Sequence, residues 1–277
     1  MSIHRKAYTP FRGEVTPRGS RSLVIARREL RLAMGRSWVR RLLAVSFLPL
    51  LGCIIFLYVR LVVEQATALT IWDGFLFETL YRVQSLFVML LMAVVGADLI
   101  AKDTAARAHS LYFSRPLAVG DYVRGKLLSV AALLAVVIVV PGLLLDIAQL
   151  LLSREADVGA FVRSLLGVSI YGAIVAGVGS AIIGWLSSLG QRARWVGIGW
   201  VAAWLLTDGM SQALQAILGE GGGARLLSIP ALFVDTARFL LAPTDEGPAA
   251  LVLLVGAGAL CWWLLHRRMV VLERREG

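Results

Sequence analysis

The chain has 277 residues, of which 58% are hydrophobic and only 17% are charged, and its mean hydropathy is +0.76. This composition excludes a pair of soluble globular domains, which the length alone would allow, and indicates a polytopic membrane protein. The net charge is +10, so anionic lipid or nucleic acid has to be considered as a binding surface.

The first 40 residues form two basic segments. Residues 1–19 combine proline, glycine and scattered arginine, which predicts a disordered cytosolic tail. Residues 20–40 predict an amphipathic helix, because apolar side chains such as Leu23, Leu30 and Trp38 recur on one side and charged ones on the other. Such a helix lies on the cytosolic leaflet with its arginines at anionic headgroups. A nucleic-acid-binding arm is the competing hypothesis, but the segment lacks interleaved aromatic residues and leads straight into an apolar run.

Residues 41–266 contain six apolar runs that can cross a bilayer as helices, at about 1.5 Å per residue against roughly 30 Å of hydrocarbon. The runs lie near residues 42–62, 83–101, 127–152, 164–189, 195–217 and 249–266. The sequence therefore predicts an all-α integral membrane protein with six transmembrane helices. Both cysteines, Cys53 and Cys261, fall inside these runs, where the expected role is that of a small buried hydrophobe.

The basic residues predict the orientation of the spans. Both termini, the 102–126 loop and the short loop after the fourth run together hold 22 of the 28 lysines and arginines. The positive-inside rule assigns that side to the cytosol, so the tail at 267–277 and the N-terminus are both cytosolic. Only three of the basic residues are lysine and the chain has no asparagine, a bias typical of a GC-rich, bacterial genome.

Two residues of the third span are candidates for a substrate path or for gating. Pro141 precedes Gly142 and removes a backbone donor, so a kink is predicted there and the bent helix could move. Asp146 lies about two turns from the outer end of the run, and a charge at mid-bilayer costs about 2.5–3.5 kcal/mol on insertion scales. Its carboxylate either faces an internal polar route, pairs with Arg60 or Arg163, or reaches the outer surface.

The fourth span is rich in small residues, including the spaced pairs Ala173/Gly177 and Ser180/Gly184, which allow another helix to approach closely. Packing within one subunit and dimerisation of two subunits both account for this pattern. The outer segment, residues 218–248, is apolar for too few residues to span, so one or two short interfacial helices are predicted.

Within the outer segment, Asp235 and Arg238 are three residues apart and share a helix face. The spacing predicts a surface ion pair, worth under about 1 kcal/mol, in preference to a ligand site.

No pattern predicts catalysis by this chain. The only phosphate-loop candidate, residues 120–126, is followed by Leu127 where Ser or Thr would hold magnesium, and its lysine opens a membrane span. The three histidines lack cysteine or carboxylate neighbours at ligand spacing, so no metal site is predicted. Motifs of serine hydrolases, zinc proteases and redox dithiols are missing from the sequence. We therefore expect a non-catalytic subunit without a bound cofactor.

The loop at 102–126 is polar but contains an apolar cluster. Apolar side chains clustered in a solvated loop would be exposed to water, so we expect the cluster to be buried against a partner protein. The cluster consists of Leu111, Tyr112, Phe113, Pro116 and Leu117, and the charged residues around it include Asp103, Arg107, His109 and Arg115.

Residues 99–126 resemble the segment between the second and third spans of ATP-binding-cassette (ABC) exporter permeases of the second type. In that family an acidic residue, a Ser-Leu or Thr-Leu pair, an apolar patch, a proline and a terminal Gly-Lys follow one another. The matching residues here are Asp103, Ser110, Leu111, Pro116, Gly125 and Lys126. The acid is Asp where Glu is common in the family. The interfacial leader, six spans and outer helical segment extend the resemblance over nearly the whole chain.

The resemblance implies a permease that dimerises and works with two copies of a separate ATPase subunit, which bind ATP and magnesium. The loop would form a coupling helix seated in a groove of the ATPase, with the apolar cluster as its anchor. The implied contact residues are Asp103, Arg107, His109, Ser110, Leu111, Tyr112, Phe113, Arg115 and Pro116.

The implied location is the bacterial inner membrane, and the expected partners are the ATPase, a second permease copy and membrane lipids, with no nucleic acid. A membrane anchor or sensor that recruits a cytosolic partner without transport is the alternative of a different class. An intramembrane enzyme finds almost no support in the residues. The sequence does not name the transported substrate.

Overall fold

The computed structural model describes residues 21–67, 76–106, 118–152, 158–190, 192–219, 223–241 and 247–276, and every regular element in these ranges is helical. In chain order the elements are α1 (Arg21–Met34), α2 (Ser37–Val45), α3 (Leu48–Thr67), α4 (Leu76–Leu91), the π-helical turn η2 (Met92–Gly96), α5 (Asp98–Ala105), α7 (Val119–Leu152), α8 (Val158–Leu189), α9 (Ala193–Leu218), the 3-10 turn η3 (Ala224–Leu227), α10 (Ile229–Leu241) and α11 (Gly247–Glu276). The predicted all-α class is confirmed for this part of the chain.

Five helical stretches among the described residues are long and apolar enough to cross a membrane, which supports a multi-pass membrane protein. They correspond to the first, second, third, fourth and sixth predicted spans, at Ser37–Glu64, Leu76–Ala105, Val119–Leu152, Val158–Leu189 and Pro248–Val271. The fifth predicted span lies in α9, which has 26 residues but is not among these five. The second half of α9 carries Asp208, Ser211, Gln212 and Gln215, so its apolar sequence is interrupted. A sixth crossing therefore stays a prediction.

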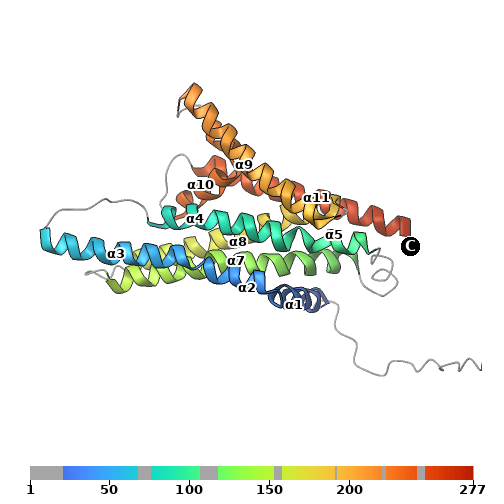
Figure 1. Cartoon of the computed structure of the whole chain (residues 1–277), viewed down its shortest axis with the longest axis horizontal. Coiled ribbons are helices and arrows are strands. Elements are labelled where there is room, and N and C mark those ends of the chain that lie inside the picture. Colours follow the sequence, from blue (N-terminus) through green and yellow to red (C-terminus); the bar gives the residue numbers. More distant parts are fainter. Residues whose placement is uncertain are drawn as a thin grey trace, which may run out of the picture.

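The long helices other than α9 lie side by side, and successive long helices along the chain alternate in direction (Figure 1). The central pair is α7 and α8; α3 and α4 pack on α7, and α11 packs on α8. One end of the bundle gathers α1, α5, the start of α7 and the end of α8. The other end gathers α10, the start of α4 and the end of α7 (Figure 1). These are called the α1 end and the α10 end below.

The small residues of the fourth span let α8 pack within this one chain. A Cβ added at Gly172 would overlap Val139 of α7, and one at Gly184 would overlap Leu127 of α7. Gly167 similarly faces the last residues of α10, where a Cβ would lie 3.0 Å from the carbonyl oxygen of Leu240. Internal packing accounts for these glycines, although a Cβ at Gly177 would meet nothing within 4 Å.

The second span is interrupted by the π turn η2, which shifts the hydrogen-bond register between α4 and α5. The N–H of Ala97 donates to the carbonyl of Met92, five residues back, at 3.0 Å. Ser187 of α8 bonds the backbone beyond the turn: its Oγ accepts from the N–H groups of Ile100 and Ala101 at 2.9 and 3.0 Å and donates to the Ala97 carbonyl. A neighbouring helix thus stabilises an irregular turn inside the bundle, as membrane interiors require.

The predicted interfacial helix is divided at Gly35. Helix α1 ends at Met34, and residues 37–45 form α2, which opens the first span. Helix α1 packs along the start of α7, where Gly125 permits the close approach: a Cβ there would lie 2.7 Å from both the Ile25 Cβ and the Ser22 carbonyl oxygen.

Candidate functional site

The polar segment predicted to contact a partner is described only at its two ends, up to Ala106 and from Ala118 onwards. Of the predicted contact residues, Asp103 lies on α5. The others lie outside the described residues: Arg107, His109, Ser110, Leu111, Tyr112, Phe113, Arg115 and Pro116. The site can therefore be described at the helix ends that hold the segment.

Lys126 ties these two helix ends together and joins both to α1. Its Nζ lies 2.8 Å from the carboxylate of Asp103 on α5 and 2.9 Å from that of Glu29 on α1. The Tyr122 hydroxyl donates to Asp103 at 2.6 Å, and the Lys126 ammonium lies 5.6 Å from the centre of the Tyr122 ring. The Lys126 side chain is 4% exposed, so its charge is almost entirely removed from water and depends on both carboxylates. We call Glu29, Asp103, Tyr122 and Lys126 the Lys126 network.

A second group of charges extends this network across the α1 end. Asp98 lies 2.5 Å from the guanidinium of Arg36, in the connection between α1 and α2, and also pairs with Lys102 one turn along α5. All the charged residues of the two groups line a cavity of about 360 Å³ between α1, α5 and α7. Three elements that are distant in the sequence are thus joined by alternating charges at the point where the predicted contact segment begins.

The phosphate-loop candidate at 120–126 lies inside α7 and is not a loop. Its lysine is held by Glu29 and Asp103, and Gly125 packs against α1. The Gly-Lys pair therefore has a packing and ion-pairing role in this chain. The sequence identifies Lys126 only as the last residue of the Gly-Lys pair that ends the family motif. Nothing in the spacing of the sequence indicates Glu29 as its partner.

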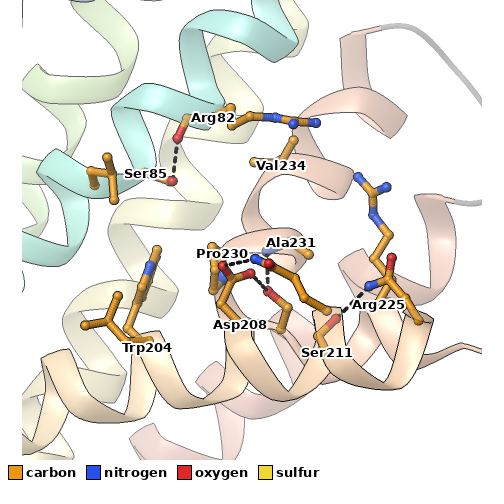
Figure 2. Close-up of a pocket in the computed structure, with 14 residues that line it drawn as sticks. Arg82, Ser85, Trp204, Asp208, Ser211, Arg225, Pro230, Ala231 and Val234 are labelled. Atoms are coloured by element: carbon orange, nitrogen blue, oxygen red, sulfur yellow. Dashed lines mark hydrogen bonds between the residues drawn. The ribbon is translucent and has the colours of Figure 1, made fainter. Parts of the chain in front are cut away.

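A polar pocket of about 490 Å³ opens at the α10 end, between α4, α9, η3 and α10 (Figure 2). Helix α9 contributes Asp208, Ser211, Gln212 and Gln215, whose i, i+3, i+4 and i+7 spacing places them on one face. Asp208 accepts hydrogen bonds from Gln212 and from the hydroxyl of Ser228, both at 2.8 Å. No feature of the sequence had marked this pocket, although the polar stripe on an apolar helix was a usable signal.

The arginines around this pocket are paired with carboxylates. Arg225 makes two hydrogen bonds to Asp235, at 2.8 and 2.7 Å, while Arg238 and Arg82 both bond Glu78 of α4. The predicted pairing of Asp235 with Arg238 is therefore wrong: each side chain has a partner on another element. The pocket lining thus combines the amide and hydroxyl groups of α9, the Asp208 carboxylate and the buried Trp204.

Pro141 lies inside α7, which is continuous from Val119 to Leu152. Because proline has no N–H, the carbonyl of Val137 loses its usual helical donor. The side-chain amide of Gln84, on α4, donates to this carbonyl. Gln84 and Pro141 are both buried, so the residue proposed for gating is bonded to the neighbouring span through its helix backbone. The expected kink stays a prediction.

Replacing Gln84 with leucine should lower the free energy of unfolding by about 1 kcal/mol, because the Val137 carbonyl would be left without a donor in the bundle. Pro141→Ala restores a backbone N–H to that carbonyl. We therefore expect Gln84→Leu to cost much less in the Pro141→Ala background, measured by thermal unfolding of the purified protein. An equal cost in both backgrounds would show that Gln84 acts elsewhere.

Asp146 lies inside the bundle and does not reach the outer surface: it is 3% exposed. The hydroxyl of Ser164, on α8, donates to its Oδ1. Neither expected cation contacts it, since Arg60 pairs with Glu64 at 2.7 Å and Arg163 is exposed. The carboxyl is thus buried in the bundle beside a serine hydroxyl, and an internal polar route past it stays a prediction.

No family model matches the chain, and no curated protein is significantly similar to it. In the described part of the chain, no group of three or more His, Cys, Asp or Glu side chains is placed to hold a metal ion.

Proposed function

We propose that this chain is the permease subunit of an ABC exporter and moves a substrate across the bacterial inner membrane while a separate ATPase subunit hydrolyses ATP. The observation that carries the proposal is the Lys126 network. It joins α5 and α7, the helices on either side of residues 107–117, to each other and to α1. A force applied to that segment would reach three helices together.

The two helices that hold the segment run the length of the bundle. The helices α4, η2 and α5 follow one another without a break, and we call this stretch the rod. Asp103 lies in the last turn of the rod, and Lys126 lies near the start of α7. At the other end of the same rod, Arg82 and Ser85 of α4 line the polar pocket (Figure 2). Movement of the rod at the α1 end would therefore change the pocket at the α10 end, which is the coupling that a transporter needs.

In the proposed assembly two copies of this chain work with two ATPase subunits, which bind ATP and magnesium. This chain is not an enzyme and carries no cofactor of its own. The α1 end and both termini face the cytosol. The second half of α9 leans away from the other helices in Figure 1 and exposes Leu206, Met210 and Ile217. A second copy or lipid would cover this apolar face.

The double substitution Leu111→Asp and Phe113→Asp tests the proposal. We expect it to abolish co-purification of the proposed ATPase subunit and stimulation of its ATP hydrolysis, because two charges would enter the apolar anchor. Leu218→Asp is the control, since it adds a carboxylate to an exposed apolar position at the α10 end. It should leave the ATPase bound.

Undiminished ATPase binding by the double variant would remove the anchor from the proposal. If the ATPase binds wild-type protein but no substrate moves in vesicles that contain both proteins with ATP, the chain is a membrane anchor. Folding is checked in each case by the unfolding temperature of the purified variant.

A further inference from the structure

Three buried polar atoms of the bundle interior have no hydrogen-bond partner among the described residues. They are the hydroxyl oxygen of Tyr81 and Oε1 of Gln84, both on α4, and Oδ2 of Asp146 on α7. Native proteins pair about nine tenths or more of their buried polar groups, so three unpaired atoms on two adjoining helices call for a physical explanation.

Tyr81 and Asp146 lie close together between α4 and α7. The Tyr81 hydroxyl touches the backbone of α7 at Gly142, where an added Cβ would overlap it, and Asp146 follows Gly142 by one helical turn. Helix α8 closes the space from the other side. The ring of Tyr171 lies 4.7 Å from that of Tyr81, and Ser164, two turns earlier on α8, donates to Asp146.

Among the described residues, no positive side chain forms an ion pair with Asp146. On α3, Arg60 pairs with Glu64 at 2.7 Å, and at the α10 end Arg238 pairs with Glu78 of α4. Among the described titratable side chains, Tyr81 interacts electrostatically with the carboxyl, and Tyr171 packs against the ring of Tyr81. Both are phenols and carry no positive charge. An ionised carboxylate would thus be buried with one hydroxyl donor, an arrangement that costs several kcal/mol.

We propose that Asp146 is a proton-binding site enclosed by α4, α7 and α8. A proton bound at Oδ2 removes the buried charge of the carboxylate. Oδ2 then becomes a hydrogen-bond donor, whereas in the ionised carboxylate it is an acceptor that receives no hydrogen bond. When the three helices separate and water enters, the O–H bond breaks and the proton passes to water. The site does not depend on an ATPase; only its use in a transport cycle rests on the function proposed above.

Infrared spectroscopy of the purified protein in lipid nanodiscs at neutral pH tests this site directly. We expect a carbonyl stretching band of a protonated carboxylic acid that shifts in heavy water and is lost in Asp146→Asn. Asp208→Asn is the control, because Asp208 accepts two hydrogen bonds at the pocket and should contribute no such band. A wild-type spectrum without the band, or an unchanged band in Asp146→Asn, would overturn the proposal.

Stability gives a second measure. Asparagine has the shape of a neutral aspartic acid, so the unfolding temperature of Asp146→Asn should match that of the wild type at neutral pH. A large loss in this variant would mean that the carboxylate is needed in its charged form. If sodium raises the unfolding temperature of the wild type more than choline does at equal ionic strength, and Asp146→Asn abolishes this difference, the site binds a metal cation. That result would overturn the proposal of a proton-binding site. Each measurement uses this chain alone, so failure of the ATPase test would leave these results unchanged.

Discussion

Replacing Lys126 with methionine is expected to lower the free energy of unfolding by about 3 kcal/mol, the lower end of the range for removing one member of a buried ion pair. The methionine keeps the length of the side chain but leaves Glu29 and Asp103 facing each other without a cation. Their mutual repulsion would push α1 away from α5 and α7. Chemical unfolding of the purified protein in detergent measures the loss, and coupling to the ATPase should fall with it.

The matched control is Lys102→Met. Lys102 also pairs with an aspartate, Asp98, but its side chain is 53% exposed, so water screens the pair and the expected loss is below about 1 kcal/mol. Neutralising both carboxylates, with Glu29→Gln and Asp103→Asn, should return much of the stability of Lys126→Met. Equal losses for the two lysine variants would contradict a special role of the buried network.

The sequence was sufficient to predict the all-α class and five membrane-length helices, because it encodes hydrophobic length directly; the sixth span stays a prediction. Apolar runs gave the five membrane-length helices, and glycine, proline and charge clusters marked the connections between them. The division of the first helix at Gly35 was not predicted. The sequence predicts the boundary between the interfacial helix and the first span near residue 41, whereas the break lies at Gly35, because the apolar and charged positions continue across it.

The partners of the charged residues could not be predicted in the same way. Helical spacing put Asp235 and Arg238 on one face, yet Arg225 and Glu78 bond them from other elements. Glu29 reaches Lys126 only because α1 packs along α7, a tertiary contact that no local pattern contains. The same holds for Gln84, whose bond to the Val137 carbonyl depends on the position of a proline in another helix.

The close approach of α1 to α7 leads to the second large effect. Gly125→Leu should detach α1, because even a Cβ would lie 2.7 Å from the carbonyl oxygen of Ser22, and a backbone atom cannot turn aside as a side chain can. Overpacking of this kind costs about 1–3 kcal/mol, and separation of α1 would also break the Glu29–Lys126 pair, so we expect the upper end of that range. The free energy of unfolding and the rate of tryptic cleavage at Arg27 and Arg28 measure the change.

Gly120→Leu on the same helix is the control, since a Cβ there would meet nothing within 4 Å. Both substitutions replace glycine with leucine in α7. Gly120 is the second residue of the helix, so leucine gains less helix propensity there than the roughly 0.8 kcal/mol at an interior position such as Gly125. Because propensity favours Gly125→Leu, a larger loss of stability in that variant is attributable to the contact with α1. If Gly125→Leu is as stable as Gly120→Leu, and α1 is cut no faster, α1 does not pack on α7 in solution. The Lys126 network would then lack Glu29, and force on the contact segment would reach α5 and α7 without α1.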